Sequence, residues 1–450
     1  MLVSQPLHFG TDGIRGPADK FPFTYEALLA LGQSFGEWAI GRYGTRTPHF
    51  LIGCDTRISC PTIKKSLIQG ISAVGGTVTD AGIIPTPAVG QLVQKTAHFN
   101  CGIIISASHN PYYDNGIKLF DAQTGKLTDA DEQCIMQCFE AFFNQPSTLT
   151  LSTTTDAVSW HEASTTYINN VCALFTPEYL KGLTIVLDCA NGATFSVAPA
   201  IFANLGANVI ALNIEPTGTN INDQCGSLHP ESLAQMVIKH NADFGFAFDG
   251  DGDRVIAVNN QGLIKDGDDL LEILLQHPAY KDTNCLVGTV MTNKGLENLL
   301  VSRNQALIRT KVGDKHVAQQ LEKENLPLGG EASGHIIIKD YLVTGDGIFV
   351  ALKTLESIVA SGNTLMQTFE KHAQVIINIR VTHKKDLAST SIKPIIDQHE
   401  QTLASGRVLV RYSGTENVLR IMTEALQHDH AQTCASSLAL HLSNVLNTEA

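Results

Sequence analysis

The chain has 450 residues, 43% hydrophobic and 17% charged, which is typical of a folded protein of about three to four domains rather than a disordered one. Lysine and arginine total 31 against 44 acidic residues, and the resulting net charge of −13 argues against a nucleic-acid surface but not against small phosphorylated ligands. No apolar run reaches the length of a membrane span, and the ten cysteines contain no Cys-x-x-Cys pair, so we expect a cytoplasmic protein without a zinc site.

The first candidate ligand contact is Arg15, in a glycine-punctuated segment near the N-terminus. Glycine lets backbone approach a ligand closely and arginine supplies a charged fork, although such pairs also occur in ordinary turns. Beyond it we expect a helix over 27–39, a buried strand over 50–53 and a helix beginning near Ser59 or Pro61. Alternating strands and helices predict right-handed βαβ units and a mostly parallel sheet.

An apolar strand over 101–106 ends in the polar loop Ser106-Ala107-Ser108-His109-Asn110-Pro111. A hydroxyl at a strand end combines a rigid scaffold with an open loop, which is where a nucleophile is expected. We therefore take Ser108 as the candidate nucleophile and expect it to carry a phosphoryl group. The alternative is a simple turn whose hydroxyls bond their own backbone.

The region after this loop predicts a helix and then a linker. Thr128 and Asp131 form a capping-box pattern for a helix running towards Phe143, and the Thr- and Ser-rich stretch 145–158 reads as a linker. A second α/β region follows, and its strand 243–248 has apolar residues on alternate positions.

That strand ends in the strongest local signal, the carboxylates Asp249, Asp251 and Asp253 with glycine between them. Three carboxylates at alternate positions can surround one hard cation. A calcium loop of the EF-hand type is excluded, because its glycine position holds Arg254 and its final glutamate position holds Asn260. An exposed acidic turn is the alternative, but it would leave three repelling charges fully solvated, so we favour a magnesium site linked to phosphate chemistry.

A third α/β region contains expected strands at 286–290 and 306–309, followed by a glycine-rich loop with Glu331, Ser333 and His335. A carboxylate, a hydroxyl and an imidazole together can grip sugar hydroxyls and move a proton. On local grounds a glycine loop with a chance polar trio is an equally good reading.

The last region holds Arg411-Tyr412-Ser413-Gly414-Thr415 on an expected strand-to-strand turn. An arginine with two hydroxyls around a glycine is chemistry suited to cradling phosphate. The same residues also form ordinary hairpins, so the stretch alone does not decide between the two.

Taken together, these motifs resemble the α-D-phosphohexomutase superfamily from end to end and in the same order. The stretches that carry the resemblance are Phe9–Gly16, Ser106–Lys118, Cys225–Pro230 and Thr344–Gly347, together with the acidic, Glu331 and Arg411 loops. The resemblance implies an α/β protein with three similar mixed α/β sheet domains and a smaller C-terminal α+β domain around a central cleft. We place these domains at 1–155, 156–258, 259–368 and 369–450.

The resemblance also implies roles by motif match. Ser108 would be the phosphoserine, and one of its oxygens would join the three aspartates around one Mg²⁺. Lys118 and Arg15 match positions beside the transferring phosphoryl group, and His335 matches a proton-transfer position. The expected substrate contacts are Arg254, Glu331 and Ser333, with Arg411, Ser413, Gly414 and Thr415 on the phosphate that is not being transferred.

The motifs are most similar to those of members that interconvert glucosamine 6-phosphate and glucosamine 1-phosphate through a 1,6-bisphosphate, feeding amino-sugar nucleotide and cell-wall precursor synthesis. Mannose or glucose phosphates are the alternative substrates. A catalytically dead sugar-phosphate-binding protein would have lost the nucleophile or the aspartates, and both are present; a metal-dependent hydrolase would require more metal ligands. We expect a small hexosamine phosphate as the partner, no nucleic acid or membrane, and a homodimer as one option.

The chain departs from the superfamily pattern at four positions. Arginine and glycine are usual where Cys54 and Cys60 stand, and proline is usual at the positions of Tyr412 and Asn417. None of these departures removes a candidate catalytic side chain.

Overall fold

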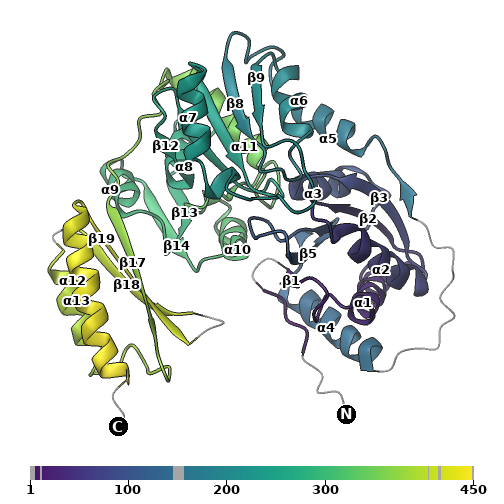
Figure 1. Ribbon diagram of the computed structural model, residues 1–450, viewed down its shortest axis with the longest axis horizontal. Helices are drawn as coiled ribbons and strands as arrows, with labels where there is room; N and C mark the ends of the chain where they lie inside the picture. Colours follow the sequence, from purple (N-terminus) through teal and green to yellow (C-terminus); the bar gives the residue numbers. More distant parts are fainter. Residues whose placement is uncertain (1–5, 11–12, 145–156, 404, 414–416, 448–450) are drawn as a thin grey trace. The chain divides into compact units, whose positions relative to one another are not determined.

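The computed structural model describes residues 6–10, 13–144, 157–403, 405–413 and 417–447. The chain divides into two compact units, the first formed by 1–282 with 313–367 and the second by 283–312 with 368–450 (Figure 1). The linker expected at 145–158 lies almost wholly outside the described residues. Among those described, no helix has both the length and the apolar character needed to cross a membrane.

The first sheet of unit 1 has the strand order β1-β5-β4-β2-β3-β7, with β6 paired to β5. Strands β4, β2, β3 and β7 are parallel, whereas β5 is antiparallel to β4 and β1, so only part of the sheet follows the predicted parallel arrangement. The short connection from β4 to β5 explains this, because a parallel crossover needs a dozen or more residues. The strands are β1 (Ile14–Pro17), β2 (His49–Cys54), β3 (Thr77–Ile83), β4 (Cys101–Ile105), β5 (Asp114–Asp121), β6 (Gly125–Lys126) and β7 (Val158–Ser159).

Four helices accompany this sheet: α1 (Tyr25–Tyr43), α2 (Cys60–Ala73), α3 (Thr86–Lys95) and α4 (Asp129–Asn144). Helix α1 packs against both α2 and α4 (Figure 1). A β-carbon at Gly32 would lie 2.4 Å from the Leu67 carbonyl oxygen, so glycine is what lets α1 and α2 approach so closely. The predicted cap at Thr128 is confirmed, since its hydroxyl accepts from the Asp131 N–H and Asp131 accepts from the Thr128 N–H.

The second sheet of unit 1 has the order β12-β11-β10-β8-β9, with β10, β8 and β9 parallel and the remaining pairs antiparallel. Its central strand β10 is buried along its whole length. The elements are α5 (Ala163–Cys172), β8 (Thr184–Asp188), α6 (Val197–Asn204), β9 (Asn208–Leu212), the 3₁₀ turn η1 (Gly226–Leu228), α7 (Glu231–Lys239), β10 (Phe244–Phe248), β11 (Val255–Asn259), β12 (Ile264–Lys265) and α8 (Gly267–Leu275).

Unit 1 is completed by the antiparallel pair β15 (Leu328–Gly330) and β16 (Ile336–Ile338), with α10 (Asp314–Glu324) and α11 (Gly347–Ser361). The turn of this pair carries the loop that contains Glu331. Helix α11 begins after the cap Asp346, whose carboxylate accepts hydrogen bonds from the Phe349 N–H and from the hydroxyls of Tyr167 and Tyr341.

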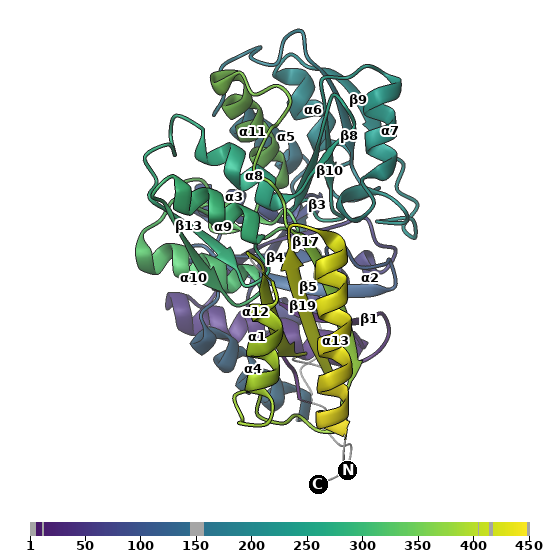
Figure 2. The same cartoon turned by 90° about the vertical axis from the view of Figure 1, so that its left-hand side faces the viewer.

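Unit 2 contains the parallel pair β13 (Cys285–Thr289) and β14 (Ala306–Thr310) with α9 (Lys294–Ser302). Its antiparallel sheet β17-β19-β18 is built from β17 (Ala373–Arg380), β18 (Arg407–Tyr412) and β19 (Val418–Ala425). Helices α12 (Lys393–Gln401) and α13 (His428–Asn447) lie side by side against one face of this sheet (Figures 1 and 2).

Candidate functional site

Ser108 lies where the chain leaves β4, in a buried turn with a left-handed backbone (φ 53°). Its hydroxyl donates to Asp249 Oδ2 at 2.6 Å, and Oγ lies 3.2 Å from His109 Nδ1. Its own N–H donates to Ser106 Oγ at 2.9 Å. The proposed nucleophile therefore meets the first carboxylate of the acidic loop, 141 residues further along the chain.

Asp249, Asp251 and Asp253 follow β10 and are buried, and each contributes a carboxylate oxygen within 4.8 Å of the others. One oxygen each of Asp251 and Asp253 has no hydrogen-bond partner among the described residues. Buried polar atoms left unpaired are costly, and a cluster of carboxylate oxygens is the ligand set that a hard cation takes. The three residues thus fit a divalent cation such as Mg²⁺.

Lys118, on β5, is buried next to this cluster. Its ammonium group donates to Asp251 Oδ2 at 3.1 Å and to Asp253 Oδ2 at 2.8 Å. Thr86, at the start of α3, donates its hydroxyl to Asp251 Oδ2 at 2.6 Å. Lysine and threonine therefore fix one oxygen of Asp251, and the other has no hydrogen-bond partner among the described residues.

The electrostatics of the cluster follow from burial and like charge. Burial, followed by the charges of Asp253 and Asp251, raises the pKa of Asp249 well above its usual range. Burial also raises the pKa of Asp253, but Lys118 and the other neighbouring cations outweigh it and hold that pKa well below its usual value. The pKa of His109 is lowered to about 4 by burial, with Arg254 and Arg15 adding to the effect, so this imidazole is neutral at physiological pH.

Two arginines were also predicted for the site: Arg254, expected as a substrate contact, and Arg15, expected beside the transferring phosphoryl group. Arg254 donates its backbone N–H to Asp249 Oδ1 at 3.1 Å, and its Nε lies 3.8 Å from Asp253 Oδ1. Arg15 is an exposed residue of β1 and pairs in register with Gly116 of β5. The Arg15 charge is one of the causes that lower the pKa of His109, after burial and Arg254.

The β15–β16 turn brings a histidine to the same cluster. His335 is buried, with Nδ1 3.6 Å from Asp253 Oδ1 and Nε2 3.7 Å from Asp314 Oδ2. Burial lowers the pKa of His335, but the two carboxylates outweigh it and the net shift is upward. Glu331 accepts the Gly313 N–H at 2.9 Å, and Ser333 is exposed.

Unit 2 holds the expected phosphate contacts. Arg411, on β18, pairs in register with Arg420 on β19, and both line a cavity of about 340 Å³. Burial, then the like charge of Arg420, lowers the pKa of Arg411, and Arg420 Nε has no hydrogen-bond partner among the described residues. Ser413 is buried at the end of β18, whereas Gly414 and Thr415 lie outside the described residues.

Several residues around the site were missed by the sequence reasoning. Arg420 and Asp314 carry no local pattern, since each becomes recognisable only through partners that the fold supplies, and His109 was given no role of its own within its loop. Asp55 and Arg57 form a buried ion pair beneath the Ser108 turn, at 2.8 Å. No local pattern in the sequence gave either residue a role.

Family models for phosphoglucomutase/phosphomannomutase match four consecutive parts of the chain. They are α/β/α domain I at residues 6–145, α/β/α domain II at 165–262, α/β/α domain III at 266–376 and the C-terminal domain at 376–441. The predicted fold class, three α/β domains followed by a smaller C-terminal one, is thereby confirmed.

Curated relatives match nearly the whole chain. A protein of Pseudoalteromonas translucida named phosphoglucosamine mutase is 42% identical over 448 residues, covering 97% of this chain and 98% of the relative. A protein of the same name from Methylobacillus flagellatus is also 42% identical, covering 96% and 97%. Among solved structures, a phosphoglucomutase/phosphomannomutase family protein from Burkholderia thailandensis superposes with a TM-score of 0.76 at 21% identity, covering 96% of this chain and 97% of that one.

Proposed function

Because the chain belongs to the phosphoglucomutase/phosphomannomutase family, we propose that it is a phosphoglucosamine mutase, an isomerase that interconverts glucosamine 6-phosphate and glucosamine 1-phosphate. The choice of amino sugar rests on relatives of that name at about 40% identity over nearly the full length. The observation that carries the chemistry is the buried Ser108 hydroxyl, hydrogen-bonded to Asp249 within a cluster of three carboxylates.

In the proposed reaction, Ser108 begins as a phosphoserine. The bond between phosphorus and Ser108 Oγ breaks while a bond to O1 of glucosamine 6-phosphate forms; O1 loses its proton to a base, and the freed Ser108 Oγ takes one up. The resulting 1,6-bisphosphate turns round, and the bond between its second phosphorus and O6 breaks while a bond to Ser108 Oγ forms; Ser108 loses its hydroxyl proton, and O6 takes one up. The product is glucosamine 1-phosphate and a phosphoserine enzyme ready for another cycle.

The catalytic work consists of positioning and charge neutralisation, because phosphoryl transfer proceeds through a loose transition state. Asp249, Asp251 and Asp253, with a phosphoserine oxygen, would hold Mg²⁺, which when bound supplies positive charge to the phosphoryl oxygens. Lys118 and Arg15 would contribute further positive charge on the protein side.

The remaining candidates would bind the sugar and its second phosphate. Glu331 would accept hydrogen bonds from sugar hydroxyls, and Ser333 would exchange hydrogen bonds with them. Arg254 would also contact the substrate, and His335 would take part in proton transfer. One phosphate site must accept either end of the bisphosphate, so it should use charge and hydroxyls without reading the ring. Arg411, Ser413, Gly414 and Thr415 have that chemistry.

The test compares turnover of glucosamine, mannose and glucose 6-phosphates by one preparation. Glucosamine 6-phosphate should be the fastest, and equal or faster turnover of mannose 6-phosphate would contradict the assignment. Mass analysis of tryptic peptides should find phosphate on Ser108 after incubation with glucosamine 1,6-bisphosphate and none in S108A. If the wild-type peptide stays unmodified, the phosphoserine mechanism is wrong.

A further inference from the structure

Arg57 is a fully buried cation that binds the backbone of the nucleophile turn. Its guanidinium donates to four carbonyl oxygens, those of Ser108 (3.1 Å), Asn110 (2.8 Å), Pro111 and Asp114 (3.0 Å). Carbonyls normally find partners in helices or sheets, and in this turn the Arg57 side chain supplies a donor to four of them, with the Asn222 amide donating to two of the same four. The planar, five-donor guanidinium is the side chain that can do this.

Asp55 fixes the direction of that guanidinium. Its Oδ2 accepts from Arg57 Nε at 2.8 Å and from the Ser106 hydroxyl at 2.6 Å, while Oδ1 accepts the Arg57 N–H at 3.0 Å. Ser106 in turn accepts the Ser108 N–H. The N–H of Ser108 is therefore linked to the Asp55 carboxylate through the Ser106 side chain, and its C=O through the Arg57 side chain.

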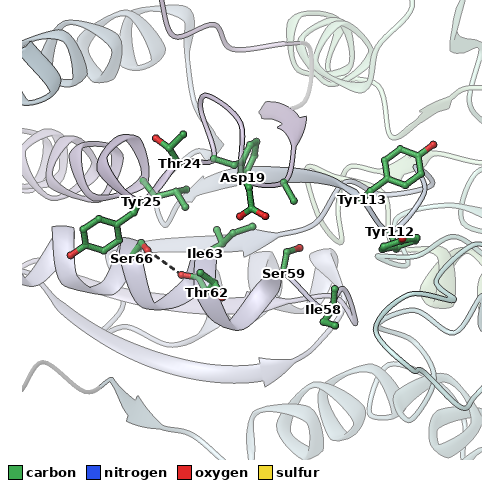
Figure 3. Close-up of a pocket in the computed structure, with 13 residues that line it drawn as sticks. Asp19, Thr24, Tyr25, Ile58, Ser59, Thr62, Ile63, Ser66, Tyr112 and Tyr113 are labelled. Carbon is green, nitrogen blue, oxygen red and sulfur yellow. Dashed lines mark hydrogen bonds between the residues drawn. The ribbon is translucent and has the colours of Figure 1, made fainter.

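The outer side of the same loop receives little support from packing. Tyr112 and Tyr113 are 40% and 55% exposed and line a cavity of about 600 Å³. Asp19 and Tyr25 line the same cavity but lie away from the two tyrosines (Figure 3). Side chains that face an open cavity cannot fix a backbone by close packing. Holding the turn thus falls to the polar contacts on its inner side.

Ser108 needs such support because its backbone is left-handed. A non-glycine residue at φ 53° is strained and persists only where its surroundings determine it. In this turn the surroundings are the Arg57 hydrogen bonds, the Ser106 hydroxyl and the Asn222 amide, which donates to the Ser108 carbonyl at 2.9 Å.

We propose that Arg57, oriented by Asp55, is a positioning residue that holds Ser108 in the conformation from which its phosphoryl group is transferred. This inference rests on the proposed function of Ser108. Arg57 contacts the carbonyl groups of the turn, whereas the proposed substrate contacts are made by other residues. Its loss should therefore lower kcat while leaving KM nearly unchanged.

The test uses R57K, with R42K as a matched control, because Arg42 also pairs with a buried carboxylate, at 3.0 Å to Asp121. Lysine keeps the charge but cannot span four carbonyls. A displacement of about 1 Å at a reacting group can reduce the rate about 100-fold, so R57K should lose about that factor in kcat with KM within about threefold of wild type. R42K should keep the wild-type kcat. Added guanidinium ion should partly restore the turnover of R57A.

Hydrogen exchange of the backbone amides is the second measurement and does not depend on substrate. In R57K, faster exchange should be confined to residues 106–116. A kcat equal to that of R42K, a proportional rise in KM, or faster exchange throughout the chain would each overturn the proposal. Wild-type protein that fails to turn over any hexose phosphate would instead refute the proposed function, and the exchange experiment would still decide the role of Arg57.

Discussion

Gly116 lies on β5, the strand between β4, which leads to Ser108, and β1, which carries Arg15. A β-carbon at this position would lie 2.1 Å from the Ser106 carbonyl oxygen and 3.0 Å from its carbonyl carbon. The Ser106 N–H also donates to the Gly116 carbonyl at 3.0 Å. Substitution by alanine therefore pushes on the residue whose hydroxyl holds the Ser108 N–H.

The size of the effect follows from this contact. Ordinary van der Waals contact begins at 3.4 Å, so G116A forces backbone atoms apart by more than about 1 Å, and no flexible side chain is available to absorb the shift. Overpacking of this kind should lower the free energy of unfolding by about 1–3 kcal/mol. A shift of about 1 Å next to the nucleophile should lower kcat about 100-fold.

The assay measures mutase turnover and urea unfolding of G116A beside the control G41A. Gly41 lies in α1, and an added β-carbon there would meet nothing within 4 Å. Alanine at Gly41 should raise stability by about 0.5–1 kcal/mol and leave the rate unchanged, because it only improves helix propensity. If G116A keeps kcat within about threefold of wild type with unchanged stability, the close approach is not a constraint and the reasoning is refuted.

R411A should raise KM for glucosamine 6-phosphate about 10- to 100-fold, which corresponds to losing one charge-assisted hydrogen bond to phosphate; an unchanged KM in steady-state assays would exclude Arg411 from the phosphate site. Removal of Mg²⁺ with a chelator should abolish turnover reversibly, and calorimetric titration of D251N with Mg²⁺ should show no binding, whereas wild-type-like heats would place the metal elsewhere. For Asp121, burial raises the carboxyl pKa, but hydrogen bonds from Arg42 and two backbone N–H groups outweigh it, so the folded pKa is lower than the unfolded one. The contribution of Asp121 to the free energy of unfolding is therefore complete above the unfolded pKa of about 3.9 and is lost as the pH falls through the folded pKa. D121N should be about 1–3 kcal/mol less stable than wild type at pH 7, with the gap closing in strong acid, and a gap in urea unfolding that does not change with pH would count against this account.

The sequence was most informative where a strand and its chemistry are contiguous. Ser108 and Asp249 each follow an apolar strand directly, and ligand sites in α/β sheets gather outside the carboxyl ends of such strands. The family resemblance implied that the two share one Mg²⁺ site, and their side chains are hydrogen-bonded at 2.6 Å. The capping box at Thr128 was predictable for the same reason, because both partners lie within four residues.

Residues whose partners lie far along the chain could not be predicted from a local pattern. Arg57 binds carbonyl groups more than 50 residues ahead, and carbonyls are identical at every position of a sequence. Arg420 is identified only by the strand register that sets it opposite Arg411. Gly414 and Thr415, predicted from their motif, lie outside the described residues, so their place in the phosphate site stays a prediction.

The charge balance of the cluster links these observations to the proposed chemistry. Asp249, Asp251 and Asp253 are buried together with Lys118 and Arg254, so three negative groups face two positive ones. A phosphoryl group on Ser108 adds a charge of about −1.5 to −2 at pH 7, which three nearby carboxylates would repel. A divalent cation offsets that charge, and the Asp251 oxygen that has no hydrogen-bond partner among the described residues is available to bind one. The arrangement thus favours phosphoserine and metal together over phosphoserine alone.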